Sequence, residues 1–114
     1  MKLIRGAWQG PIWIGGDSTA ALRRAARWDG WVANSVATEG MTMTPDGLAQ
    51  RVQQIGRGAG FEVACNGYSS PADRALCEAY AGAGATWWLE NMHDRRFEPD
   101  ELLARVAAGP ATAR

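Results

Sequence analysis

The 114-residue chain has no excess charge of either sign, because twelve basic side chains balance twelve acidic ones. A net charge of zero removes the broad attraction by which basic proteins bind nucleic acid or anionic membranes. The chain also lacks an apolar run of membrane-spanning length, and residues 1–5 lack the apolar core of a signal peptide. We therefore expect a cytoplasmic protein that binds neither nucleic acid nor a membrane.

Metal-binding and nucleophilic side chains are also scarce. The chain has two cysteines, Cys65 and Cys77, and a single histidine, His93. The spacing of the cysteines matches no usual zinc motif, so we expect no metal site and two free, reduced thiols. The sequence contains no nucleophile elbow and no Walker loop, so neither of these catalytic classes is indicated.

What the sequence does contain is a regular alternation of short apolar runs with amphipathic segments. This pattern predicts an α/β fold of four consecutive βα units in one parallel sheet. Cap-and-proline pairs at Thr44-Pro45 and Ser70-Pro71 are typical of helix starts. The predicted strands are 12–14, 31–34, 61–65 and 86–89, and the predicted helices are 19–28, 44–55, 70–81 and 100–107. No linker divides the chain, so we expect one domain over 1–114, with 109–114 as a frayed tail.

Apolar side chains are assigned to faces by their spacing. In the last helix, we expect Leu102, Leu103 and Val106 to point inward. Trp87 and Trp88 are adjacent in a strand, so they should point to opposite faces of the sheet. Most of the six tryptophans are expected to pack in the core, and the alternative is that one of them lines a ligand pocket.

The most informative segment is Pro11–Ser18, in which an apolar run ends in Gly15 and Gly16 before a helix start. Bare amides and the positive end of a helix meet at such a turn and favour a phosphate. Asp17 and Ser18 are suited to capping the helix. The next strand ends at Asn34-Ser35, whose side chains would lie at the same edge. The alternative for the two glycines is that they only make a tight turn. The alternative for Asn34 and Ser35 is that their side chains only form the hydrogen bonds common in turns.

The block PIWIGGDSTAALRRAARWDGW, at 11–31, resembles a block of luciferase-like flavin-dependent monooxygenases, and AGAGATWWLEN and LLARVAAGP resemble two later blocks. The resemblance implies a TIM-type barrel that acts on a small organic substrate with FMN or the deazaflavin F420. It implies that Gly15 and Gly16 contact the flavin phosphate and that Asn34 and Ser35 border it. With Asp17 and Ser18, these residues are the six candidate cofactor-binding residues. Asp17 departs from this pattern, because an acid beside a phosphate is unfavourable unless it points away.

A full (β/α)8 barrel takes about 250 residues, so the chain corresponds to the C-terminal half of one. A truncated reading frame and a genuine half-barrel product remain open. We expect the chain to contribute a flavin phosphate site. The alternative is a non-catalytic half-barrel that self-associates as a homo-oligomer or docks on a separate first half. A third reading is a doubly wound phosphate-binding module.

His93 is the candidate catalytic residue. It follows the fourth strand, with Glu90 and Asp94 nearby in the sequence. An imidazole can act as a general base because its pKa lies near neutrality. The alternative is a solvent-exposed loop residue.

Overall fold

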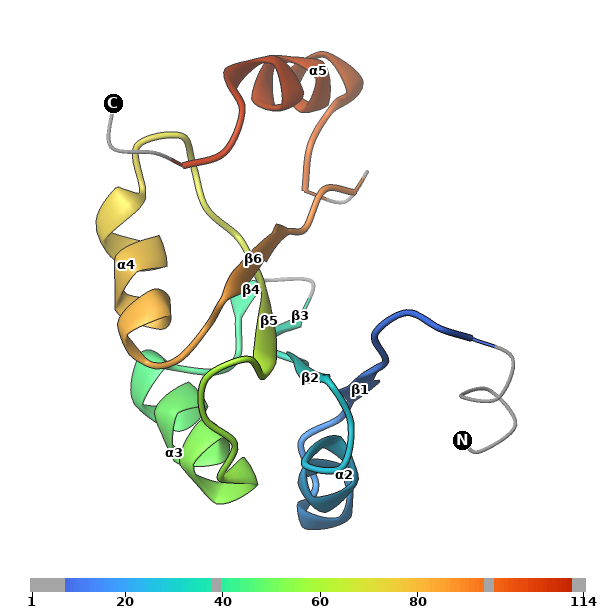
Figure 1. Ribbon diagram of the computed structural model, residues 1–114. Helices are drawn as coiled ribbons and strands as arrows, with labels where there is room; N and C mark the ends of the chain where they lie inside the picture. Colours follow the sequence, from blue (N-terminus) through green and yellow to red (C-terminus); the bar gives the residue numbers. More distant parts are fainter. Residues whose placement is uncertain (1–7, 38–39, 94–95, 112–114) are drawn as a thin grey trace.

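The computed structural model describes residues 8–37, 40–93 and 96–111 (Figure 1). Four strands form one sheet in the order β1-β2-β5-β6, and each pairing is parallel. The elements are, in chain order, β1 (Trp13–Gly15), α2 (Thr19–Ala25), β2 (Gly30–Ala33), β3 (Val36–Ala37), β4 (Gly40–Met41), α3 (Pro45–Ile55), β5 (Glu62–Gly67), α4 (Arg74–Gly82), β6 (Trp87–Glu90) and α5 (Pro99–Ala108). The predicted alternation of four strands and four helices is therefore confirmed.

The strand order follows the sequence, since each sheet strand pairs with the next one along the chain. The register aligns Ile14 with Trp31, Trp31 with Val63, and Cys65 with Trp88. A doubly wound module requires a point where the strand order reverses. The described sheet has no such reversal, so its strand order is not that of a doubly wound module. The antiparallel pair β3–β4, which lies between β2 and α3, was not predicted.

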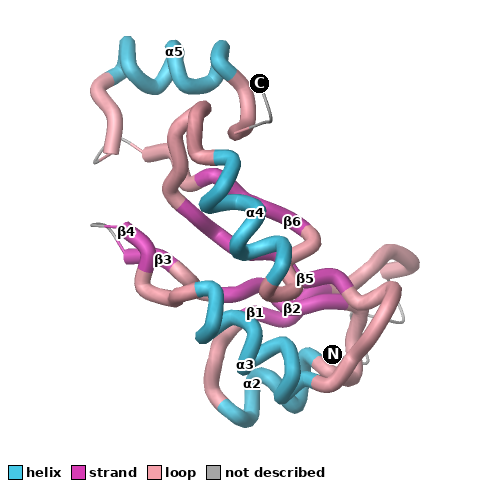
Figure 2. Tube along the Cα trace, turned by 90° about the vertical axis from the view of Figure 1, so that its left-hand side faces the viewer, coloured by secondary structure: helices cyan, strands magenta, loops and turns pink. Residues whose placement is uncertain are grey.

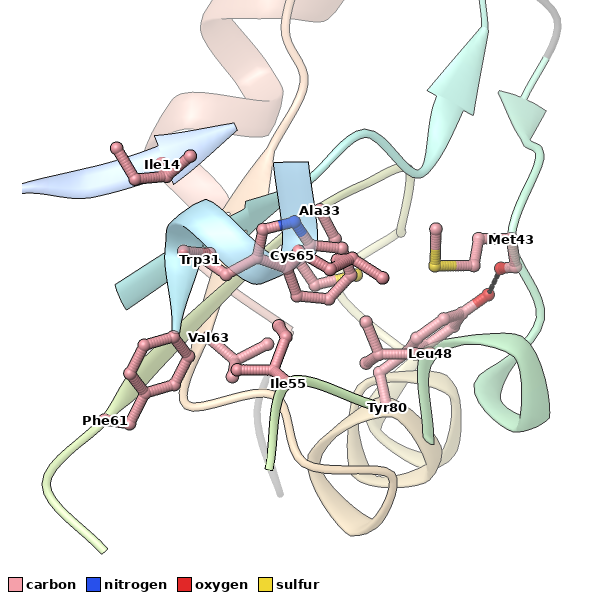
Figure 3. Close-up of a cluster of buried hydrophobic side chains, with 12 residues drawn as sticks. Ile14, Trp31, Ala33, Met43, Leu48, Ile55, Phe61, Val63, Cys65 and Tyr80 are labelled. Carbon is pink, nitrogen blue, oxygen red and sulfur yellow. Dashed lines mark hydrogen bonds between the residues drawn. The ribbon is translucent and has the colours of Figure 1, made fainter. Parts of the chain in front are cut away.

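The core lies between the sheet and the helices α2, α3 and α4 (Figures 1 and 3). The sheet contributes Ile14, Trp31, Ala33, Val63 and Cys65, which are all buried. The helices contribute their inward side chains, which include Leu22, Leu48, Ile55 and Tyr80. The strand alternation therefore sends the odd-numbered residues of β2 and β5 toward the helices, and Trp88 packs against the same cluster.

The opposite face of the sheet carries Trp13, Val32, Trp87 and Leu89, of which Trp87 is 50% exposed and Leu89 37% exposed. Trp87 and Trp88 thus point to opposite faces, as expected. Ile14 and Val63 belong to the helix-covered core, and Ile12 packs against it.

Helix starts follow the cap signals in two of three cases. The Ser18 hydroxyl accepts a hydrogen bond from the Ala21 amide at 3.1 Å, and the Thr44 hydroxyl accepts one from the Gly47 amide at 3.1 Å. The predicted start at Ser70-Pro71 is wrong, because α4 begins at Arg74. There the Asp73 carboxylate accepts a hydrogen bond from the Ser70 amide, which makes a turn in place of a helical cap.

Helix α5 lies apart from the other helices, beyond the carboxyl ends of the strands (Figure 2). Leu103 is 69% exposed and Val106 is 59% exposed, so the expectation that both point inward is wrong. The side that faces the protein instead carries Arg105, which is buried. Of the expected frayed tail, 112–114 lies outside the described residues. Among the described helices, none has the length and apolar character needed to cross a lipid bilayer.

Candidate functional site

In the glycine turn after β1, the space around the Gly15 backbone is free, whereas Gly16 has a conformation and a neighbour that disfavour any side chain. A Cβ added to Gly15 would meet no heavy atom within 4 Å. Gly16 has a φ of +101°, which side chains rarely allow, and a Cβ there would lie 3.0 Å from the Ala21 Cβ. The Trp31 indole N–H donates to the Gly16 carbonyl at 2.6 Å and fixes the turn against β2.

The two polar residues after the turn point in different directions. Ser18 caps α2 with its side-chain oxygen, so that oxygen is already engaged. The Asp17 carboxylate lies 3.7 Å from the Arg51 guanidinium of α3, in a solvent-accessible ion pair. Asp17 therefore turns aside toward a neighbouring helix and does not cap α2. A carboxylate held by an arginine repels an anion at the turn less than a free one would.

Asn34 and Ser35 follow β2 but have different environments. Asn34 is exposed, and it lies two residues after Val32, the register partner of Gly15. The structure thus places Asn34 at the same edge of the sheet as the glycine turn. Ser35 is fully buried, and its hydroxyl donates to the Asn66 carbonyl at 2.5 Å. Its side chain therefore joins β2 to the end of β5 and does not reach the surface.

Cys65 lies directly beneath this contact, with its sulfur 3.4 Å from the Ser35 hydroxyl oxygen. Burial raises the pKa of the Cys65 thiol, and the hydrogen bond with Ser35 opposes that shift only partly. The thiol is therefore protonated at neutral pH and behaves as a core side chain.

His93 is half-buried, and its Nε2 lies 3.0 Å from the Tyr68 hydroxyl. The two rings meet edge to face, with centroids 5.9 Å apart. The Nδ1 atom of His93 is buried and has no hydrogen-bond partner among the described residues. Tyr68 was missed at the sequence level, although it follows β5 closely, as His93 follows β6. Asp94, the other expected neighbour, lies outside the described residues.

A second cluster, centred on Glu90 at the end of β6, was also missed. The Glu90 side chain is 11% exposed and accepts hydrogen bonds from the Ser69 amide at 2.7 Å and from Arg96 at 2.6 Å. It also accepts bonds from the Ser69 hydroxyl, from Trp88 and from Arg105. Burial alone would raise the Glu90 pKa, but the hydrogen bonds from Ser69 and Arg96 outweigh it and lower the pKa.

This Glu90 cluster attaches α5 to the carboxyl end of the sheet. Arg105 of α5 bonds both the Ser69 hydroxyl and the Glu90 carboxylate. A cavity of about 380 Å³ lies beside it, between α5 and the segment that follows β5, with Pro71, Phe97 and Ala104 in its wall. The cluster pairs one carboxylate with two guanidinium groups from the following loop and from α5, and in this way it positions α5. Among the described residues, no group of His, Cys, Asp and Glu side chains forms a metal site.

The carboxyl edge of the sheet thus brings together the glycine turn and Asn34, whereas the Tyr68–His93 pair follows the other two strands. Of the six residues expected to bind the cofactor, Gly15 and Asn34 are exposed at this edge and Gly16 is half-buried there. No protein-family model matches the chain, and no curated protein or solved structure matches it either.

Proposed function

We propose that this chain is the C-terminal half of a luciferase-like flavin-dependent oxidoreductase or monooxygenase, and that it contributes the site for the phosphate of FMN or F420. The observation that carries this proposal is the turn at Gly15 and Gly16. It joins a parallel strand to a helix and leaves the backbone of Gly15 open to close approach. Main-chain amides at such a turn bind phosphate oxygens without a lysine.

The surroundings of the turn support the same assignment. Asp17 is paired with Arg51 and so does not oppose an anion with a free charge. Asn34 is exposed at the same edge and has an amide group to donate. Because α2 has only seven residues, its dipole is short, and the amides of the turn would supply most of the attraction. A bound flavin would supply the redox chemistry, and these residues would hold its phosphate.

Four sequentially ordered βα units are half of what an eight-stranded barrel requires. In the family that the sequence resembles, the flavin ring and the substrate lie mainly against the first half. We therefore expect the isolated chain to have little or no monooxygenase activity. In a stopped-flow experiment with reduced FMN and oxygen, the rate of flavin oxidation should equal the rate in buffer. A chain-dependent change of that rate would contradict this expectation.

The second candidate is a non-catalytic half-barrel that associates with another half. The observation that favours it is the uncovered sheet face, where Trp87 and Leu89 are exposed. Large apolar side chains grouped on a surface commonly mark an interface. The two candidates are compatible, because association could restore the wall of a flavin site.

Titration with FMN, riboflavin and inorganic phosphate tests the flavin proposal. FMN should bind at least about tenfold more tightly than riboflavin, which lacks the phosphate, since charge-assisted hydrogen bonds contribute about 1.5–3 kcal/mol. Inorganic phosphate should compete with FMN. Gly15→Ala should weaken FMN binding, because its new methyl group occupies the open approach to the backbone.

Gly58→Ala is the matched control, because a Cβ there also meets nothing within 4 Å and the residue lies after α3, away from the turn. It should bind FMN as the wild type does. Equal affinity for FMN and riboflavin, or equal loss in both variants, would remove the phosphate site from the turn.

A further inference from the structure

The Glu90 cluster carries more positive than negative charge. Its single carboxylate faces two guanidinium groups, because Arg96 lies 2.6 Å from one oxygen of Glu90 and Arg105 lies 3.1 Å from the other. The two arginine side chains are only 17% and 5% exposed, and within the described part of the chain both pair with this one acid. Since a buried charge is costly unless it is paired, the cluster favours one further negative group.

The Arg105 guanidinium also keeps one donor without a partner. One of its terminal nitrogens donates to the Gly109 carbonyl, and the other donates to the Ser69 hydroxyl at 3.3 Å and to Glu90 at 3.1 Å. The Nε atom, in contrast, is buried and has no hydrogen-bond partner among the described residues. A buried N–H of a charged group is costly to leave unpaired, and an oxygen acceptor placed against it removes that cost.

The cavity of about 380 Å³ beneath α5 gives a ligand access to these arginines. It lies on the side of α5 that faces the protein, beyond the carboxyl ends of the strands (Figure 2). Arg96 and Arg105 both line it, and Pro71, Phe97 and Ala104 form an apolar part of its wall. Its volume is in the range of small-molecule sites. Cationic donors beside apolar side chains suit an organic anion better than a strongly hydrated inorganic one.

Two further features define the anion that fits. The Arg96 guanidinium lies over two aromatic rings, 4.8 Å from the centre of Tyr68 and 4.5 Å from that of Phe97, so its position is fixed before a ligand arrives. Glu101 also lines the cavity, but it is exposed, and its carboxylate accepts a hydrogen bond from the Glu98 amide at 3.3 Å. Water and salt screen an exposed charge, so Glu101 weakens the attraction without cancelling it. One excess buried charge with an acid at the rim favours a monoanion over a dianion.

We propose that this cavity binds a small monocarboxylate with an apolar body. Its carboxylate accepts the unpaired Nε–H of Arg105 and supplies the second negative charge of the cluster, and its body contacts Phe97 and Ala104. Guanidinium groups suit this role because their planar set of N–H donors matches the oxygens of a carboxylate. The site follows β5 and β6, whereas the glycine turn follows β1, so the inference is independent of the flavin.

Benzoate and benzamide test the proposal, because they share a shape and differ in charge. Benzoate should bind at least about tenfold more tightly than benzamide, since hydrogen bonds to an ionised group are stronger than neutral ones. Inorganic phosphate should displace benzoate at least about tenfold less effectively than unlabelled benzoate does, because it gains nothing from the apolar wall. Nuclear magnetic resonance of the tryptophan indole N–H groups measures these affinities and locates the site.

Two indoles report on the two ends of the sheet. Trp88 donates its indole N–H to Glu90 at 3.1 Å, so its resonance should shift when benzoate binds beside the cluster. Trp31 donates its indole N–H to the Gly16 carbonyl at 2.6 Å, so its resonance should stay in place with benzoate. FMN at the glycine turn should shift Trp31 and leave Trp88 unchanged.

Three variants of α5 test the walls of the cavity. Ala104→Leu fills the cavity without removing a charge and should weaken benzoate binding at least about tenfold. Ala107→Leu makes the same change on α5 at a residue outside the lining, so it is the control and should bind as the wild type does. Glu101→Gln keeps a side chain suited to the capping box and should tighten benzoate binding about threefold at low ionic strength. Circular dichroism verifies that the variants fold.

Equal affinity for benzoate and benzamide would overturn the proposal, as would benzoate binding that survives Ala104→Leu. The absence of any Trp88 shift up to about 10 mM benzoate would also overturn it. A benzoate-dependent shift of Trp31 in place of Trp88 would move the anion to the glycine turn and remove the separate site. Because FMN is followed through Trp31 in the same samples, failure of the flavin site and failure of the carboxylate site give different results.

Discussion

Glu90 connects several segments of the chain, and no single motif in the sequence indicates these contacts. Its carboxylate is nearly buried and contacts two arginines, Arg96 and Arg105, which come from the following loop and from α5. A buried charge is tolerated only when it is paired and hydrogen-bonded. The loss of this one carboxylate would leave two partly buried cations without their counter-charge.

We expect Glu90→Gln to lower the free energy of unfolding at pH 7 by about 3 kcal/mol, since breaking a buried ion pair from one side is strongly destabilising. Glu78→Gln is the control. It removes the carboxylate of the exposed Arg74–Glu78 pair and should change the free energy of unfolding by less than about 0.5 kcal/mol. Urea unfolding of the three proteins measures both values, and equal effects would contradict the role given to Glu90.

The same carboxylate predicts a pH dependence. The Glu90 pKa is lowered in the folded state, because hydrogen bonds from Ser69 and Arg96 outweigh the effect of burial. Its stabilising contribution is therefore complete above the ordinary glutamate pKa and is lost as the pH falls through the lower, folded-state value. Unfolding free energies measured from pH 7 down to pH 3 should fall more steeply for the wild type than for Glu90→Gln. Parallel curves would exclude this linkage.

At the residue scale, the local sequence pattern predicted the glycine turn, but it predicted neither the Tyr68–His93 pair nor the Glu90 cluster. Gly15 and Gly16 stand out because a strand, a turn and a helix follow one another within a few residues. The contact of Tyr68 with His93 joins two segments 25 residues apart. Ser35 was expected at the surface, yet its hydroxyl bonds Asn66 in the next strand. Such contacts depend on which strands are neighbours, which single residues do not reveal.

Among the elements, helix starts show how far a cap signal can be trusted. Thr44-Pro45 and Ser70-Pro71 have the same pattern, but only the first begins a helix. An acidic residue follows both pairs, Asp46 in the first case and Asp73 in the second. The Asp73 carboxylate accepts from the Ser70 amide and stabilises a turn that postpones α4. At Ser70 this bond belongs to a turn, and the helix begins only after Asp73.

Two alanine substitutions measure this difference. Thr44→Ala removes the hydrogen bond to the Gly47 amide and should lower the free energy of unfolding by about 1 kcal/mol. Ser70→Ala should cost less than about 0.5 kcal/mol, because Ser70 is exposed and does not cap α4. Thermal or urea unfolding distinguishes them. A larger loss for Ser70→Ala would restore the sequence-based helix start.

For the whole molecule, the order of the strands was predictable and the position of α5 was not. The alternation of strands and helices defines which strands pair, because crossovers in a parallel sheet have a preferred hand. The apolar side of a helix, in contrast, indicates that another element should pack against it but does not identify that element. Leu103 and Val106 were expected inside, but α5 lies beyond the carboxyl ends of the strands and both side chains are exposed (Figure 2).

This arrangement predicts unequal protection from hydrogen exchange. In the isolated chain, the amides of α5 should exchange at least about tenfold faster than those of α3. The reason is that α3 buries Leu48 and Ile55, whereas α5 is held mainly through Arg105. Hydrogen exchange followed by mass spectrometry resolves the two helices. Equal protection would show that α5 packs more firmly than its exposed leucine and valine suggest.

The contact between Trp13 and Trp87 provides an intrinsic spectroscopic probe of the sheet. Two indoles 5.8 Å apart and tilted by 52° are close enough for their electronic transitions to couple, which produces a paired positive and negative band in circular dichroism. Because the two rings sit on opposite edge strands, any opening or flattening of the sheet separates them. The amplitude of that band would therefore report the curvature of the sheet directly, without a label, as ligand or partner is added.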